Sequence, residues 1–314
     1  MKFPRSRRRG RPDHPEEINP LFLSPGTADS GGILESLGIE LIPEREFREL
    51  AAIISRHFGI KVGKNKLTLV TGRIHPIMER HGFDSYGDYV QALKEDQNGN
   101  LLSELANHIS TNHTGFYRED AHFAVLMKKV LPDIVARKNR MHDRDLRVWC
   151  AACSTGEEAY TIQFCLLKHF GIDYKGWRAG VLATDLSTAA LDKAKAGRYA
   201  AQRVGDVPPD ILARYFHRVD EDTYEVAAAV RSEVTFRRLN LTRRDFPLKK
   251  QFDIIFCRNV MIYFDPPTRR ALVEKFRNWL EDGGYLFIGH SESISWTADS
   301  LRYIAPSVYA KTKG

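Results

Sequence analysis

The chain has 314 residues, of which 43% are hydrophobic and 28% charged, and its formal net charge is +7. These values are typical of a soluble globular protein, and the length is sufficient for two domains of ordinary size. No stretch approaches the roughly 18 consecutive apolar residues of a membrane-spanning helix, and the basic N-terminus lacks the apolar core of a signal peptide. We therefore expect a cytoplasmic protein without membrane insertion.

Residues 1–35 are rich in Arg, Pro, Gly and Ser, and this composition predicts a basic disordered arm. Much of the excess positive charge lies in its first dozen residues, MKFPRSRRRGRP. Such a run could touch nucleic acid or an anionic surface, but aromatic residues are not interleaved with its arginines. We expect no specific nucleic-acid partner.

Residues 36–111 predict a small helical domain. In EREFRELAAIISRHFG, apolar residues recur at helical spacing from Phe47 to Phe58, and Gly59 ends the helix. KNKLTLVTGRIHPIMERHG indicates a second helix, although Gly72 and Pro76 weaken the pattern. SYGDYVQALKED and NLLSELANHIS supply two more.

From residue 112 to residue 314, strands alternate with helices. This order predicts an α/β fold with a doubly wound, mostly parallel sheet. Residues 198–233 interrupt the alternation with a short helix, PPDILARYF, and an expected hairpin in DTYEVAAAVRSEV, and we interpret them as a small inserted antiparallel β subdomain. The expected strands are LRVWCAA, WRAGVLATD, VTFRRLNL, FDIIFCRNV, GYLFIGH and SVYAKTK, and the expected helices are EEAYTIQFCLLKHFG, STAALDKAKAG and PPTRRALVEKFRNWLEDG.

Two of the four cysteines, Cys150 and Cys153, have the spacing of a redox pair or of half a zinc site. No second such pair or nearby pair of histidines completes a metal site, and Cys165 and Cys257 lie far away in sequence. We expect structural cysteines and no metal.

The first expected strand leads into VWCAACSTGEEAY, residues 148–160. In open α/β sheets ligands bind beyond the carboxyl ends of the strands, and a dinucleotide site would show GxGxxG. Here a single glycine, Gly156, precedes Glu157 and Glu158, which would repel a phosphate group. The pattern favours a ligand that carries an ammonium group and no phosphate, such as S-adenosylmethionine. The alternative is that both acids only stabilise the helix dipole.

Three further strand ends carry polar residues. Asp185 could accept hydrogen bonds from ribose hydroxyls, or it could cap the next helix, although Ser187 already suits that role. Asn240 could meet an adenine edge or be structural. Arg258 and Asn259 interrupt the apolar run FDIIFCRNVMIYF, which suggests that they lie at the mouth of a binding site.

Six motifs together resemble the chemotaxis receptor methyltransferases (CheR-type), which use S-adenosylmethionine to methylate glutamate side chains of chemoreceptors. The resemblance runs from about Leu41 to the end of the chain. Ala159 and Tyr117 replace the proline and phenylalanine usual in the family, and neither change touches a group expected to bind. The motifs are TNHTGFYRE, VWCAACSTGEEAY, ATDLSTAALDKAKAGRY, VTFRRLNL, FDIIFCRNVMIYFD and GYLFIGHSES.

The resemblance implies roles for individual residues. Glu158 would bind the methionine ammonium group and Asp185 the ribose hydroxyls. Arg118 and Tyr263 would lie beside the transferred methyl group as catalytic residues. The implied cofactor-binding set is Asn112, Thr114, Arg118, Glu158, Asp185, Asn240, Leu241, Arg258 and Asn259.

The chemistry implied is in-line methyl transfer to an ionised carboxylate, with S-adenosylhomocysteine as the other product. Glutamate has a pKa near ~4.3, so it needs no general base at neutral pH. Orientation by Arg118 and Tyr263 could supply much of the rate enhancement. The stretch RNVMIY lacks the prolines that amine methylases of nucleic acid often carry at this strand end.

Lys66, Arg73 and Arg80 are spaced by seven, which predicts a basic helix face for the glutamate-rich receptor helices, or else an ordinary solvated face. The inserted loop FHRVDEDTYEV is short, acidic and free of glycine, so we expect no binding of a receptor tail peptide. Two other functions stay open: a nucleic-acid methylase, supported only by the basic arm, and a cofactor sensor without catalysis.

Overall fold

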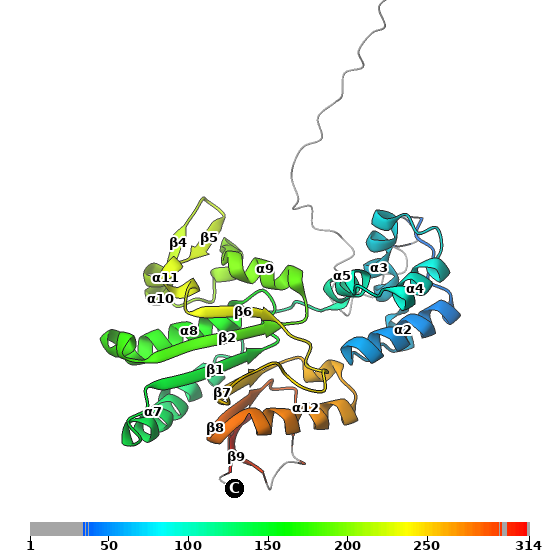
Figure 1. The fold of residues 1–314 in the computed structure, drawn as a ribbon. Coiled ribbons are helices and arrows are strands. Elements are labelled where there is room, and N and C mark those ends of the chain that lie inside the picture. The colour runs from blue at the N-terminus through cyan, green and yellow to red at the C-terminus, as the bar shows by residue number, and fades with distance from the viewer. Residues whose placement is uncertain (1–33, 35, 37, 295, 297–299, 313–314) are drawn as a thin grey trace, which may run out of the picture.

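The computed structural model describes residues 34, 36, 38–294, 296 and 300–312, so nearly all of the expected basic arm lies outside the described part. Figure 1 shows helices α2–α5 gathered beside one end of a sheet whose faces carry most of the remaining helices, while α10 and α11 lie with β4 and β5 in the inserted subdomain. Among the described residues, no helix combines the length and the apolarity needed to cross a bilayer.

The helical unit contains the helices expected from the sequence. Its apolar core gathers side chains from all four, including Leu50, Ile74, Tyr89 and Leu105. Gly59 ends the first helix with φ 69°, a left-handed conformation that favours glycine. The bounds are α2 (Glu44–Phe58), α3 (Leu67–His81), α4 (Tyr86–Glu95) and α5 (Asn100–Ile109).

The main sheet has seven strands in the order β6-β2-β1-β7-β8-β10-β9. The first five run parallel, and β10 and β9 add antiparallel pairings at one edge, so the predicted mostly parallel sheet is confirmed. The bounds are β1 (Asp145–Ala151), β2 (Arg178–Asp185), β6 (Val234–Arg238), β7 (Phe252–Cys257), β8 (Leu280–Ile288), β9 (Leu301–Ala305) and β10 (Val308–Lys311).

Alternate residues of the central strands enter different cores because successive side chains of a strand point to opposite faces. Val148 and Cys150 pack in the core on the side of helices α7, α8 and α9, whereas Trp149 and Ala151 pack against α12. The helices on these faces are α6 (Ala121–Val125), a π-helical turn (Leu126–Val130), α7 (Leu131–Arg140), α8 (Glu157–Phe170), α9 (Thr188–Ala196) and α12 (Pro266–Trp279).

The inserted subdomain is present, but its expected hairpin is wrong. Its three-stranded antiparallel sheet has the order β3-β5-β4, so β5 pairs with the strand before it and not with residues after it. The alanine-rich stretch that follows forms a short helix, in keeping with the high helix propensity of alanine. The elements are β3 (Arg198–Ala200), α10 (Pro209–Tyr215), β4 (Phe216–Arg218), β5 (Thr223–Val226) and α11 (Ala228–Arg231).

Two other expectations need correction. The helix expected through Gly283 ends at Trp279, and Leu280 already has extended backbone and begins β8, which reaches the buried centre of the sheet. Strand β9 and the helical run from Ala121 to Arg140 were not predicted.

Candidate active site

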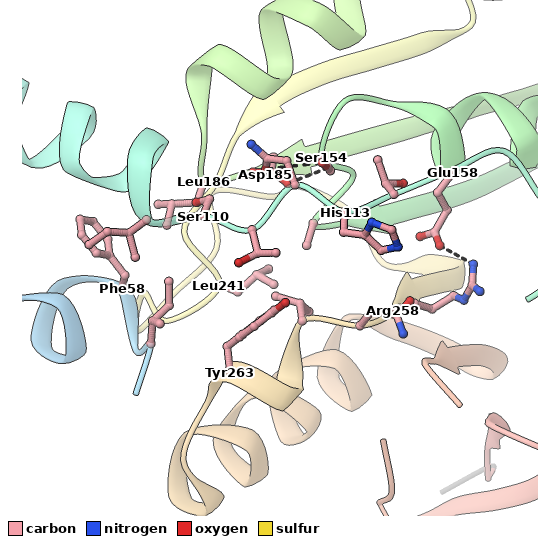
Figure 2. A pocket seen from close by; sticks show the side chains of 18 of the residues that line it. Phe58, Ser110, His113, Ser154, Glu158, Asp185, Leu186, Leu241, Arg258 and Tyr263 are labelled. Atoms are coloured by element: carbon pink, nitrogen blue, oxygen red, sulfur yellow. Dashed lines mark hydrogen bonds and ion pairs between the residues drawn. The ribbon is translucent and has the colours of Figure 1, made fainter. Parts of the chain in front are cut away.

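The residues predicted from the strand ends and from the resemblance meet at one pocket (Figure 2). The pocket lies where the carboxyl ends of β1, β2, β6 and β7 face the helical unit, which contributes Phe58, Ile60 and Ile109 to its wall. The predicted residues that line it are Asn112, Thr114, Arg118, Glu158, Asp185, Asn240, Leu241, Arg258, Asn259 and Tyr263.

Asp185 ends β2 and is held by backbone groups. Its carboxylate accepts hydrogen bonds from the N–H of Ser154 at 2.8 Å and of Ser187 at 2.9 Å. Burial raises the pKa of this carboxyl, and the N–H donors of Ser187 and Ser154 oppose that shift. The cap of α9 is Ser187, which accepts from the Ala190 N–H at 3.1 Å. The capping alternative for Asp185 is therefore wrong, and its free lone pairs can accept from a ligand.

The two glutamates that begin α8 point in different directions. Glu157 is fully buried and bonds to Arg203 of the inserted subdomain and to the Thr155 hydroxyl. Glu158 faces the pocket, where its Oε2 lies 2.5 Å from Nη1 of Arg258. Of these two glutamates, only Glu158 is placed to meet a cationic ligand in the pocket.

Arg258 is 5% exposed and bridges two carboxylates. Besides Glu158 it contacts Glu119, with 2.9 Å between Nη2 and Oε2, and it donates to the backbone carbonyl of Arg118 at 2.5 Å. Burial lowers the pKa of the guanidinium, but Glu158 and Glu119 raise it above its ordinary value. Arg258, which interrupts the apolar run of the sequence, therefore belongs to a buried ion cluster at the edge of the pocket.

Glu119 was not predicted as a functional residue. Its second oxygen accepts from the side-chain amide of Asn259 at 3.1 Å, and its Oε2 also accepts from the N–H of His290 at 3.2 Å. Burial raises the pKa of this carboxyl, but hydrogen bonds from Asn259 and Arg258 outweigh it and lower the pKa to about 2. Its place directly after Arg118 in TNHTGFYRE was the signal that could have identified it.

Glu292 fixes the backbone that presents Asn259. Asn259 has φ 57°, a left-handed conformation uncommon for residues other than glycine. The buried Glu292 carboxylate accepts from the N–H groups of Asn259 at 3.1 Å, Gly289 at 2.7 Å and Ile262 at 3.3 Å. Glu292 lies in the motif GHSES and was also missed, because two of its three partners are backbone N–H groups distant in sequence.

Asn240 lines the pocket, but its side chain is already engaged. The amide donates to the carbonyl of His57 at 2.6 Å, and the amide oxygen accepts from the N–H of Thr242 at 3.0 Å. Asn240 therefore connects the helical unit to the pocket. A hydrogen bond to an adenine edge would have to compete with these partners.

Tyr263 projects into the space between the Asp185 end and the Glu158 end (Figure 2). Its backbone carbonyl accepts from the N–H of Lys61 at 2.9 Å, so the helical unit also holds the tyrosine in place. Arg118 lies in the segment that joins the two units, and its Nη1 donates to the carbonyl of His113 at 2.7 Å.

The structure places the expected receptor-binding residues Lys66, Arg73 and Arg80 in different surroundings. Arg80 pairs with Glu104, and Arg73 is partly buried, with Nη1 donating to the carbonyl of Ile109 at 2.6 Å. Lys66 precedes α3, and its Nζ lies 5.8 Å from the ring centroid of Tyr263. Lys66 therefore lies close to the predicted catalytic tyrosine, and Arg73 is also near enough to interact electrostatically with it.

Glu119, His122 and His290 have donor atoms within 4.8 Å of one another, a separation that a metal ion could bridge. However, both oxygens of Glu119 already accept hydrogen bonds, one of them from the cationic Arg258. A metal ion there would face that guanidinium. All four cysteines are free and buried.

The pocket suits S-adenosylmethionine. Asp185 offers an acceptor for ribose hydroxyls, and Glu158 offers an anion for an ammonium group. Nε of Arg258 is buried without a partner in the described chain, which leaves it a donor to satisfy. Apolar side chains for a base come from Phe58, Ile60, Leu239, Leu241 and Phe264.

The family models and the similar sequences agree on one family. Residues 112–309 match the family model "CheR methyltransferase, SAM binding domain", and residues 45–110 match "CheR methyltransferase, all-alpha domain". A chemotaxis protein methyltransferase of Borreliella burgdorferi is 37% identical over 270 residues, covering 86% of this chain and 95% of that protein. The Escherichia coli chemotaxis protein methyltransferase is 33% identical over 276 residues, covering 87% and 92%.

Proposed function

The chain belongs to the CheR methyltransferase family and uses S-adenosylmethionine, and from this premise we propose that it methylates glutamate side chains of chemoreceptors. The products would be glutamyl methyl esters and S-adenosylhomocysteine. The observation that carries the proposal is that Arg118 and Tyr263 line the same pocket as the residues proposed to bind the cofactor. We also propose a cytoplasmic location.

The cofactor supplies an electrophilic methyl group on a sulfonium. In the proposed reaction Asp185 accepts from the ribose hydroxyls and Glu158 binds the ammonium group. A glutamate side chain enters ionised, because its pKa of ~4.3 lies far below neutral pH. Its attack therefore requires no general base.

Arg118 and Tyr263 would orient the incoming carboxylate. The guanidinium can donate a charge-assisted hydrogen bond, and the phenol can donate a second one. Both must hold the carboxylate weakly enough for the attacking oxygen to keep its nucleophilicity, because negative charge is lost in the transition state. Their contribution is orientation, which can lower a barrier by roughly 7–11 kcal/mol.

We propose that the receptor helix approaches over the rim where Lys66 lies beside Tyr263. Lys66 is the member of the expected basic set best placed to meet a glutamate-rich helix. Arg73 and Arg80 would act there only if the receptor displaced their present partners.

We further propose that this enzyme does not bind a receptor tail peptide. The loop between β4 and β5 is short, and Arg218 at the end of β4 donates to the loop carbonyls of Asp220 and Glu221. Tight binding of such a peptide in a calorimeter would refute this. We propose no specific nucleic-acid partner, and salt-sensitive RNA binding that depends on residues 1–35 would contradict that.

The direct test is incubation of the full chain with S-adenosylmethionine labelled in its methyl group and with receptor-bearing membranes. We expect label on the receptor that is released as methanol by mild base. A receptor with its methylated glutamates replaced by alanine is the control and should stay unlabelled. Base-stable label on protein or nucleic acid would overturn the proposal.

A further inference from the structure

An amide side chain of the helical unit, Asn107, reaches the start of helix α9. Asn107 lies on α5, which Figure 1 shows beside α9. Its Oδ1 accepts from the hydroxyls of Ser187 at 3.0 Å and Thr188 at 3.3 Å, and its Nδ2 donates to the Thr188 hydroxyl at 3.1 Å. One side chain therefore joins the helical unit to a segment of the sheet unit that lies 80 residues away in sequence.

Asn107 also takes part in capping α9. The first N–H groups of a helix have no partner within that helix, so side chains or water must satisfy them. Ser187 accepts from the N–H of Ala190 at 3.1 Å, and Oδ1 of Asn107 accepts from the N–H of Ala189 at 3.4 Å. The start of α9 is thus completed by a side chain from the other unit.

The same helix start holds Asp185, the proposed acceptor for the ribose hydroxyls. The N–H of Ser187 donates to Asp185 at 2.9 Å, while the hydroxyl of the same serine donates to Asn107. Leu186, between the two, packs against the apolar core of the helical unit and also lines the pocket. Asn107 is not among the described residues that line that pocket, so it would act on the ligand only through Ser187 and Asp185.

We propose that Asn107 is a positioning residue for cofactor binding, which fixes the start of α9 and with it the Asp185 carboxylate. The inference rests on the cofactor pocket of the proposed function. It adds that the helical unit contributes to cofactor affinity through a hydrogen-bonded link outside the pocket. Because Arg118 and Tyr263 are not part of this link, it should affect binding of the cofactor and not the transfer step.

The test is Asn107→Ala in the full chain, with cofactor affinity measured by calorimetry and turnover measured with receptor-bearing membranes. Alanine preserves the helical propensity of α5 and removes all the contacts of the amide. We expect the affinity for S-adenosylmethionine to fall by ~5-fold, as for one net hydrogen bond, and kcat at saturating cofactor to change by less than ~2-fold. An unchanged affinity would overturn the inference, and so would a fall in kcat as large as the fall in affinity.

Two matched variants separate positioning from a general loss of stability. Asn107→Asp keeps an acceptor for Ser187 and Ala189, and its charge suits a helix N-terminus, so the affinity should stay within ~2-fold of wild type. Asn100→Ala makes the alanine substitution at the exposed first residue of α5 and should leave the affinity unchanged. A loss in either variant as large as that in Asn107→Ala would overturn the inference.

Thr188→Val covers the case in which Asn107→Ala does not fold. It removes the hydroxyl that contacts both polar atoms of the Asn107 amide, and it leaves the bond between Ser187 and Asp185 in place. We expect the affinity to fall by ~2- to 3-fold, because the Ser187 hydroxyl still reaches Asn107. A normal affinity in Thr188→Val would then overturn the inference. If wild-type protein bound no cofactor, the cofactor site itself would be wrong, which is a different failure.

Discussion

The two ends of the pocket hold their carboxylates by different means. At the end proposed to bind the ribose of the cofactor (the ribose end), Asp185 is held by N–H groups of Ser154 and Ser187, close to the strand that carries it. At the end proposed to bind the methionine part of the cofactor (the methionine end), Glu158 is held by Arg258, which lies 100 residues away in sequence and also pairs with Glu119. The ribose end is thus a local backbone feature, and the methionine end is an ionic assembly of distant segments. We expect a single substitution at the ribose end to affect that end alone. A single substitution at the methionine end should disturb the whole ion cluster.

The largest effect should come from Arg258→Met at the methionine end. The change leaves Glu119 and Glu158 partly buried and facing each other without a cation. Removal of one partner from a buried ion cluster costs about 3–5 kcal/mol, so the midpoint of thermal unfolding should fall by many degrees. Arg45→Met is the control, because Arg45 is 80% exposed and its pair with Glu49 should contribute nothing measurable. Equal melting of Arg258→Met and wild type would show that the cluster is not a stabilising assembly.

Asp185→Ala tests the ribose end. Hydrogen bonds to a charged group are each worth about 1.5–3 kcal/mol, so loss of the carboxylate should weaken S-adenosylmethionine binding by roughly 30-fold or more. Calorimetry of the purified variant gives the number. Asp192→Ala on the exposed side of α9 should leave the affinity unchanged, since Asp192 pairs only with Lys195 in the described structure. A normal affinity in Asp185→Ala would remove the ribose assignment.

Tyr263→Phe separates catalysis from cofactor binding. The phenol is expected to orient the substrate carboxylate, so its loss should lower kcat by about 10-fold, the effect of one hydrogen bond. The affinity for S-adenosylmethionine should change by less than about 2-fold. Tyr303→Phe, at a tyrosine that is 60% exposed on β9, is the control and should alter neither quantity. If cofactor affinity fell and kcat did not, the roles of the two ends would be misassigned.

The sequence indicated the carboxylate of the ribose end but not all the carboxylates of the methionine end. The reason is the distance in sequence between the residues that interact. Asp185 at the end of an apolar strand indicates an acceptor at a sheet edge, and its partners are neighbours of that edge. Glu119 and Glu292 have partners more than 30 residues away, so nothing in their local sequence reports that they converge on Arg258 and Asn259. The resemblance named Arg258 and Asn259 but not the carboxylates that hold them.

The errors in the fold have a similar origin. Apolar periodicity found the helices and most strands, because it reports which face of an element is buried. It could not distinguish a hairpin from a strand followed by a short helix in DTYEVAAAVRSEV, since the partner strand β4 precedes that stretch. For the expected basic face, charge spacing could not reveal that Arg80 has Glu104 as a partner or that Arg73 donates to the carbonyl of Ile109.

The smallest expected effect concerns acid, and it again distinguishes the two ends. Burial, together with the neighbouring Arg258 and His290 side chains, lowers the pKa of His122 from 6.5 to about 4. Because the folded pKa is the lower one, the stability due to neutral His122 is complete above pH ~6.5 and is lost as the pH falls toward 4. Acidification from pH 7 to pH 5 should therefore lower the free energy of unfolding by on the order of 1 kcal/mol through this group.

Urea titrations at the two pH values should show a smaller difference for His122→Phe than for wild type, whereas His217→Phe at an exposed site should behave like wild type. Glu119 has its pKa lowered to about 2 from 4.5, so its own contribution is lost only below pH ~4.5 and does not obscure this comparison. Identical pH dependence in His122→Phe and wild type would mean that protonation of His122 beside the ion cluster does not destabilise the fold.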